Sequence, residues 1–173
     1  KKIIFAMLTL AIIAFTACKD EDDPIEEIPD NSESVLINEM LPRNTEHGSD
    51  QDGEFDDWIE LYNSSDEDLN ISGYYLSDDK NFVTKWSFPD GTIIGSKNYL
   101  IVWTDDDTTQ VGLHTNFKLS ATNGETVLLL TPEEEVINMV QFPPADVEQS
   151  WARKPNATGD FEWSVPTFNK SND

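Results

Sequence analysis

Short apolar or alternating segments, separated by turn residues, recur about every ten residues from position 35 to the C-terminus. Alternation over four to eight residues is typical of a half-buried β-strand, whereas the spacing of an amphipathic helix is weak here. The six clearest strand segments are residues 35–41, 57–63, 82–88, 98–104, 126–131 and 136–142. Residues 149–154 and 161–165 are two more candidates, so the pattern predicts an all-β sandwich or barrel of seven to nine strands.

Residues with turn chemistry stand between these segments. Asn123-Gly124 matches a primed hairpin turn, because both residues tolerate positive φ. The stretch from residue 42 to residue 55 lacks a strand pattern and reads as a long loop at one end of the fold. Loops longer than about 12 residues are usually functional or disordered, so this loop is the first place to look for a site.

The chain before position 35 has a different pattern. Lys1 and Lys2 precede an uncharged, mostly apolar run over residues 3–15, and small residues follow at positions 16 and 17. This order is typical of a secretory signal peptide, and the run is shorter than the roughly 20 residues that a transmembrane helix needs. We therefore predict a signal peptide over residues 1–17, with a buried first helix as the alternative.

Cys18 is the only cysteine of the chain. The sequence Phe15-Thr16-Ala17-Cys18 resembles the lipobox of bacterial lipoproteins, in which the cysteine becomes the first mature residue and carries the lipid. That family prefers Leu where Phe15 stands, while Ala17 and Cys18 match it well. Lipidation explains an unpaired cysteine in an exported protein, for which a free thiol is the alternative. We predict membrane anchoring through a lipid on Cys18.

Residues 19–34 contain eight acidic residues and two prolines. Such a segment cannot bury enough apolar surface to offset its ordering entropy, so we predict an extended acidic linker over residues 18–34 and one globular domain over residues 35–173. The run Cys-Lys-Asp-Glu-Asp-Asp also resembles the export signal of surface lipoproteins of the Bacteroidetes. The resemblance implies an outer-membrane protein that faces outward; a merely solvating linker is the alternative.

The chain is strongly acidic, with 34 acidic residues, 11 basic residues and a net charge of −23. Nucleic acid is excluded as a partner, because its binding needs lysines and arginines that displace counterions. Anionic lipid headgroups are repelled as well, so attachment to a membrane is expected from the lipid and not from a protein face. Cations are the natural small partners of such a surface.

A series of motifs, taken in chain order, resembles the lamin tail domain. The most specific is Asp-Trp-Ile-Glu-Leu-Tyr-Asn at residues 57–63. The others are INE at 37–39, LNISGYYLSD at 69–78, WSFP at 86–89, YLIV at 99–102 and FKLS at 117–120, with looser matches in QSWAR at 149–153 and PTFN at 166–169. In these last two, Ala152 stands where Gly is common and VPTF replaces the usual Thr-Pro-Gly run.

The resemblance covers residues 35–169 and implies an immunoglobulin-like β-sandwich that acts as an interaction module, with no enzymatic activity. Bacterial versions of the domain occur in secreted and lipid-anchored proteins. We therefore expect a lipid-anchored cell-envelope protein whose domain serves binding, adhesion or assembly with an unidentified protein or glycan partner. The alternative is a metal-dependent envelope hydrolase that uses the acidic loop at residues 50–57.

Nucleophilic catalysis has little support in the sequence. The chain has two histidines, His47 and His114, and no Gly-x-Ser-x-Gly element. We expect His114 at a strand edge or in a loop, and we predict no catalytic residue.

Two glutamates, Glu39 and Glu60, stand inside otherwise apolar strand segments. A buried lone carboxylate is costly, so each needs a partner. The lamin tail family has a late arginine in a similar element, and the resemblance therefore suggests Arg153 as that partner. We predict a structural ion pair of Glu39 and Glu60 with Arg153; a catalytic acid–base pair is the alternative.

The loop at residues 47–57 is the best candidate for a ligand site. Its carboxylates alternate along a flexible backbone, and hard oxygen ligands at that spacing suit Ca²⁺. The EF-hand pattern fails, because Gly53 arrives too early and no Glu stands at the twelfth position. We predict weak Ca²⁺ binding, with no other cofactor; a solvated acidic loop is the alternative. The predicted ligands are Asp50, Asp52, Glu54 and Asp56.

A second acidic loop follows the strand predicted at residues 98–104. Its Asp107-Thr108-Thr109 sequence resembles the three-residue O-glycosylation site of exported Bacteroidetes proteins, in which Thr108 would be the acceptor. We predict glycosylation at Thr108 from this resemblance.

Overall fold

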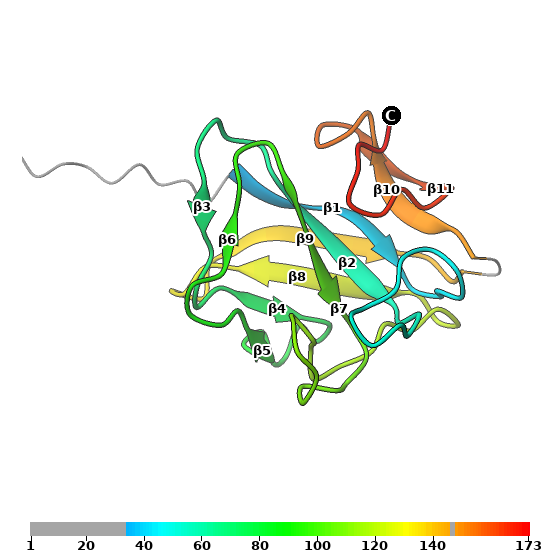
Figure 1. Cartoon of the computed structure of the whole chain (residues 1–173), viewed down its shortest axis with the longest axis horizontal. Helices are drawn as coiled ribbons and strands as arrows, with labels where there is room; N and C mark the ends of the chain where they lie inside the picture. Colours follow the sequence, from blue (N-terminus) through cyan, green and yellow to red (C-terminus); the bar gives the residue numbers. More distant parts are fainter. Residues whose placement is uncertain (1–33, 146–147) are drawn as a thin grey trace, which may run out of the picture.

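The computed structural model describes residues 34–145 and 148–173 (Figure 1). These residues form eleven β-strands, which carry most of the apolar side chains of the core. The strands are β1 (Val35–Leu41), β2 (Trp58–Asn63), β3 (Leu69–Asn70), β4 (Tyr75–Ser77), β5 (Trp86–Ser87), β6 (Ile93–Ile94), β7 (Tyr99–Trp103), β8 (Glu125–Leu130), β9 (Val136–Phe142), β10 (Ser150–Lys154) and β11 (Asp160–Ser164). Within this part of the chain, no helix has both the length and the apolar character that crossing a bilayer requires.

The strands form two main antiparallel sheets and one small one. The larger sheet has the order β11-β10-β1-β2-β7, the second has the order β5-β4-β8-β9, and β3 pairs with β6. Alternate side chains of a strand point to opposite faces, so each main sheet offers one apolar face to the other. Ile37 and Ile59 of the first sheet and Leu76 and Val127 of the second belong to one buried cluster. The predicted all-β sandwich is confirmed.

Strand prediction succeeded where the alternating run was long. The predicted segments 35–41 and 136–142 coincide with β1 and β9; β2 and β10 are one residue shorter than predicted, β7 is one residue shorter at each end, and β8 and β11 are shifted by one residue. Residues 82–88 were predicted as a strand, but only Trp86–Ser87 form one, β5, because the start of the segment belongs to a turn. In that turn Ser77 Oγ donates to the Phe82 carbonyl (2.8 Å), and Phe82 itself is exposed.

Eleven strands exceed the predicted seven to nine. The three that were missed, β3, β4 and β6, have two or three residues each, too few to display an alternating pattern. The predicted primed turn at Asn123-Gly124 is wrong as well. Only Gly124 has positive φ (+66°), and its N–H donates to the Ser120 carbonyl (3.0 Å) inside a loop that leads into β8. A primed hairpin turn needs a strand on both sides, and no strand precedes this one.

Candidate functional site

Three strand ends meet at one end of the five-stranded sheet, which we call the loop edge. Leu41 at the end of β1 pairs with Trp58 at the start of β2, and Trp58 pairs with Trp103 at the end of β7. Their side chains form a buried apolar cluster with Ile101 and Phe168 packed against it. Two loops start from this base, residues 42–57 and residues 104–124, so the fold brings segments about 60 positions apart to the same edge.

The stretch from Asp50 to Glu54 is a tight turn in the first of these loops. Oδ1 of Asp50 accepts hydrogen bonds from the backbone N–H groups of Asp52 (2.9 Å) and Glu54 (2.8 Å). Gly53 has a φ of +85°, which glycine adopts at little cost. The turn withdraws Asp50 from solvent, leaving it 8% exposed, and its second carboxylate oxygen, Oδ2, is buried without a hydrogen-bond partner.

Three of the four predicted calcium ligands converge. One carboxylate oxygen each of Asp50, Glu54 and Asp56 lies within 4.8 Å of the other two. Asp52 is outside this group and exposed, because its backbone and not its side chain faces Asp50. Burial raises the pKa of Asp56, and the negative charges of Asp105, Glu54 and Asp50 raise it further. The cluster therefore concentrates negative charge at a partly buried point.

The second loop is bonded directly to the acidic turn. Gln110 Nε2 donates to Glu54 Oε2 (2.9 Å), and Gln51 Nε2 lies 3.1 Å from His114 Nε2. His114 is 3% exposed, and its Nδ1 lies 2.7 Å from Asp105 Oδ2. These contacts fit a neutral imidazole that donates from Nδ1 to Asp105 and accepts at Nε2 from Gln51. His114 thus holds the two loops together. Its backbone forms an isolated β-bridge with Trp103, which agrees with the expected position at a strand edge or in a loop.

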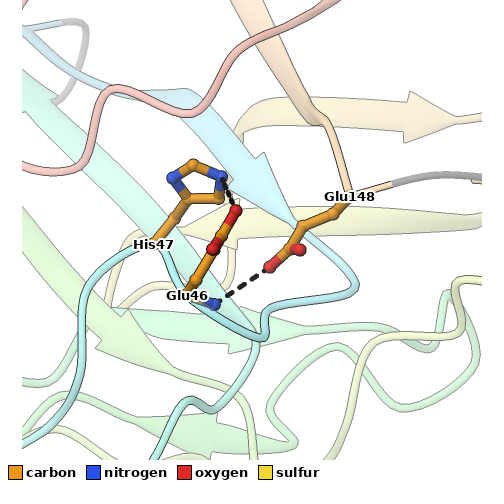
Figure 2. Close-up of side chains that lie close together, drawn as sticks. All are labelled: Glu46, His47 and Glu148. Carbon is orange, nitrogen blue, oxygen red and sulfur yellow. Dashed lines mark hydrogen bonds and ion pairs between the residues drawn. The ribbon is translucent and has the colours of Figure 1, made fainter.

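A second group of possible metal ligands brings Glu46 and His47 of the first loop close to Glu148, which precedes β10 (Figure 2). The carboxylate of Glu148 already accepts hydrogen bonds from Thr45 Oγ1 (2.6 Å), from the Thr45 N–H and from the Glu46 N–H (3.1 Å). The hydrogen bond from the Thr45 hydroxyl is the main cause that lowers the pKa of Glu148. His47 Nε2 lies 3.9 Å from Glu46 Oε1. We assign this group the structural task of attaching residues 45–46 to the chain that enters β10.

The predicted ion pair of Glu39 and Glu60 with Arg153 is not formed. Arg153 Nε donates to the Ile37 carbonyl (3.0 Å), its NH1 group donates to the Gly159 carbonyl (3.3 Å), and its guanidinium lies 4.6 Å from the centre of the Phe161 ring. Those backbone carbonyls occupy the donors that the prediction reserved for the glutamates. The pairing was inferred from the resemblance to the lamin tail family, and it overlooked the backbone N–H groups of the C-terminal segment, which need acceptors.

Glu39 and Glu60 instead hold the C-terminal segment against β1 and β2. Glu39 accepts from the Thr167 N–H (3.0 Å) and from the Thr167 hydroxyl, while Glu60 accepts from the Asn169 N–H (2.7 Å) and from Asn38 Nδ2 (3.0 Å). Both glutamates are fully buried. Burial raises the pKa of Glu39, and burial together with the nearby Glu39 charge raises the pKa of Glu60 to about 8 despite these hydrogen bonds.

Asn172 completes the attachment of the C-terminal segment. Its Nδ2 donates to the Asn38 carbonyl and to the Arg153 carbonyl, both at 3.1 Å, and the residue is 1% exposed. Neither Asn172 nor Gln110 was singled out from the sequence. The available signal was weak: each is a polar residue in a segment with no pattern, and its partners lie in strands or loops far away in the sequence.

Of the two predicted modification sites, Thr108 lies within the described residues and Cys18 lies outside them. Thr108 is exposed, and the neighbouring Thr109 caps Asp107 through its N–H (3.0 Å) and its hydroxyl (2.6 Å), so glycosylation at Thr108 stays a prediction. Cys18, the predicted signal peptide over residues 1–17 and nearly all of the predicted linker lie outside the described residues.

Two antiparallel sheets packed face to face, with long loops gathered at one edge, define an immunoglobulin-like β-sandwich. The family model of the lamin tail domain matches residues 29–143, and the chain belongs to the lamin tail domain family. No curated protein matches the chain in sequence. Membership confirms the resemblance noted in the sequence and indicates a protein-interaction module. Strands β10 and β11 and the C-terminal segment lie beyond the matched range.

Proposed function

We propose that this protein is a non-catalytic binding module of the bacterial cell envelope, anchored at the outer membrane by a lipid on Cys18 and exposed at the cell surface. The observation that carries the proposal is membership of the lamin tail domain family over residues 29–143. The lipobox-like sequence before Cys18 and the acidic run after it supply the anchoring and the spacing. Partner binding is assigned to the loop edge that begins after Leu41 and Trp103.

The direction of β1 supports this assignment. The described chain enters β1 at Val35 and reaches the loop edge after Leu41, seven residues later (Figure 1). A strand rises about 3.3 Å per residue, so the loop edge lies on the order of 20 Å from the entry of the chain. An anchor on the N-terminal side therefore leaves the loops on the side of the sandwich that is remote from the attachment point.

Exposed apolar side chains occur in both loops. Phe55 is 48% exposed between Glu54 and Asp56, and Val111 is 80% exposed next to Gln110. Protein interfaces are enriched in aromatic residues, and their rims are polar. A glycan platform would need exposed tryptophans. Trp103 is buried, and the other three candidates, Trp86, Trp151 and Trp163, are partly buried. A protein partner is therefore favoured over a glycan.

The family also weighs against the hydrolase alternative, since immunoglobulin-like lamin tails act as interaction modules. Three converging carboxylates suit a structural cation as well as a catalytic one. In our proposal the acidic turn shapes the binding edge and carries out no reaction.

The anchoring is tested with native protein from the host. We expect mass spectrometry to find a lipid on Cys18, Cys18→Ser to release the protein from membrane fractions, and protease added to intact cells to digest the wild-type domain. A bare Cys18 thiol in membrane-bound native protein contradicts the anchor. Protection from protease in intact cells contradicts surface exposure.

Partner binding is tested by crosslinking on intact cells with three versions of the chain. We expect a specific crosslinked protein with the wild type, its loss with the double variant Phe55→Ser/Val111→Ser, and its retention with Ile93→Ser. Ile93 is 54% exposed in β6, and the neighbouring Ile94 carbonyl accepts from Asn63 at the end of β2 opposite to the loops, so it controls for the loss of any exposed apolar side chain. Equal crosslinking by all three versions would remove the loop edge from the proposal.

A further inference from the structure

Buried acceptor atoms without donors gather at the loop edge. Across residues 34–145 and 148–173, five buried side-chain atoms have no hydrogen-bond partner, and four of them belong to the two loops. Three of these four are oxygens that can only accept: Asp50 Oδ2, Asp56 Oδ2 and Gln110 Oε1. An unpaired buried carboxylate oxygen is costly, so such a concentration favours a partner that supplies positive charge.

We propose that the loop edge is a calcium-binding site in which Asp50, Glu54 and Asp56 are the carboxylate ligands and Gln110 supplies a carbonyl oxygen. The site does not depend on the proposed function, because cation binding and partner binding are separate properties of the edge. Asp50 is the central ligand. Its Oδ1 is used by the turn, which fixes the carboxylate, and its buried Oδ2 is left for the ion.

The setting of the carboxylates favours Ca²⁺. Ca²⁺ binds oxygens at about 2.3–2.6 Å in flexible geometry, whereas Mg²⁺ demands a near-ideal octahedron with bonds of about 2.0–2.1 Å. One oxygen from each of Asp50, Glu54 and Asp56 lies within 4.8 Å of the others, close enough for the three to share one ion. Calcium also tolerates the irregular geometry of a loop, and it completes its shell with water.

Gln110 joins the ligand set through its amide. Its Nε2 now donates to Glu54 Oε2 at 2.9 Å, while Oε1 of the same amide has no partner. A half-turn of the amide exchanges the nitrogen and the oxygen, which places the carbonyl oxygen beside the Glu54 carboxylate where a cation can join the two. Glu54 and Gln110 are 56 residues apart in sequence, so the ion would link the two loops.

The charge around the cluster points the same way. Asp105 adds a fourth carboxylate, and its charge acts on Asp56 together with the charges of Glu54 and Asp50. His114 is bonded to Asp105 at 2.7 Å and, as a neutral imidazole, does not offset these charges. A divalent ion would neutralise repulsion that the described contacts leave in place.

The test is calorimetric titration of the full chain, stripped with a chelator, with CaCl₂ and separately with MgCl₂. We expect one Ca²⁺ per chain with a dissociation constant between about 10⁻⁵ and 10⁻³ M, the range of weaker sensor sites and extracellular modules, and weaker binding of Mg²⁺. Asp50→Asn and Asp56→Asn should each weaken Ca²⁺ binding at least tenfold. Asp52→Asn is the matched control, because Asp52 lies in the same turn and stands outside the group.

Thermal melting provides the second measurement and guards against misfolded variants. The same concentration of Ca²⁺ should raise the melting temperature of the wild type and of Asp52→Asn by several degrees, and should raise that of Asp56→Asn by less. In chelator, Asp56→Asn should melt above the wild type, because removing one of the clustered charges relieves repulsion when no ion is bound.

Three results would overturn the proposal. The first is no heat and no melting shift with wild type at about 10 mM CaCl₂, well above the weakest expected dissociation constant. The second is equal loss of binding in Asp52→Asn and Asp50→Asn, which would mean diffuse attraction by an acidic loop. The third is tighter binding of Mg²⁺ than of Ca²⁺. None of these results bears on crosslinking through Phe55 and Val111, so the two proposals fail separately.

Discussion

Replacing Glu60 by glutamine should change how the stability of this protein depends on pH. The pKa of Glu60 in the folded protein is about 8, raised from 4.5 by burial and by Glu39. Between these two values the folded state holds a proton that the unfolded state releases. Stability from this group is therefore fully present below about pH 4.5 and is lost as pH rises to about 8.

The magnitude follows from the pKa values. A shift from 4.5 to about 8 corresponds to about 5 kcal/mol at 1.36 kcal/mol per unit, of which about 4 kcal/mol falls between pH 5 and pH 8. Glutamine resembles the protonated acid, because it is neutral and has the same shape. Like the acid proton, its amide NH₂ would face one of the two donors that now bond to Glu60, the Asn38 side-chain amide and the Asn169 N–H. The variant should therefore keep the low-pH behaviour of this site at every pH.

The assay is urea unfolding of wild type and Glu60→Gln between about pH 5 and pH 9, followed by tryptophan fluorescence in the presence of chelator. The free energy of unfolding of the wild type should fall relative to that of the variant by about 4 kcal/mol from pH 5 to pH 8. Carboxylates remote from Glu60 titrate alike in both proteins and cancel in the difference, whereas Glu39 is coupled to Glu60 and contributes to it. A difference that stays constant over this range, with the variant less stable throughout, would refute the reasoning, because it would mean that Glu60 is ionised in the fold.

Three further substitutions test contacts of the loops and the C-terminal segment. Gly48→Ala should lower the free energy of unfolding, measured by calorimetry, by about 3 kcal/mol, because φ is +79° and a Cβ would stand 2.4 Å from the Phe168 ring. Its control is Gly53→Ala, which has φ +85° and nothing within 4 Å of the added Cβ; it should cost only about 1 kcal/mol in the same measurement. Asn172→Ala should cost about 2–3 kcal/mol in urea, since two buried carbonyls lose their donor; a loss under 0.5 kcal/mol contradicts the attachment. Arg153→Lys should cost about 1–2 kcal/mol, and the loss should be the same in about 1 M salt, whereas an ion pair would make it salt-dependent.

The sandwich could be predicted because its long strands carry the alternating signal themselves. Ile37, Ile59 and Val127 are apolar in runs that also fix which face is buried. Strands such as Leu69–Asn70 and Ile93–Ile94 have no such signal, because two residues cannot define a period and their pairing is decided by the loops around them. The turn after Ser77 that shortens β5 was also missed; it is held by the Ser77 hydroxyl, by Asp79 Oδ1 and by the Phe82 N–H, which donates to the Asp79 carbonyl (3.1 Å).

The candidate site was predictable only in its local part. Asp50, Glu54 and Asp56 lie within seven positions, so their spacing alone suggested a common ligand. Gln110 and His114 join them because β7 pairs with β2 and ends at the same edge, a fact of strand order that the sequence pattern does not contain. The incorrect partner for the glutamates has the same origin: the family resemblance suggested Arg153, but the path of the C-terminal segment decides which donors reach the carboxylates.

The attachment of the C-terminal segment also has a consequence for timing during synthesis. Glu39 and Glu60 emerge from the ribosome 128 and 109 residues before Thr167 and Asn169, which donate to them in the finished fold. At about 5–20 residues per second, this leaves a lag on the order of ten seconds in which the first hairpin carries two carboxylates whose final donors do not yet exist. Until residues 167–169 are present, the buried carboxylates of β1 and β2 lack the backbone donors that offset part of their desolvation.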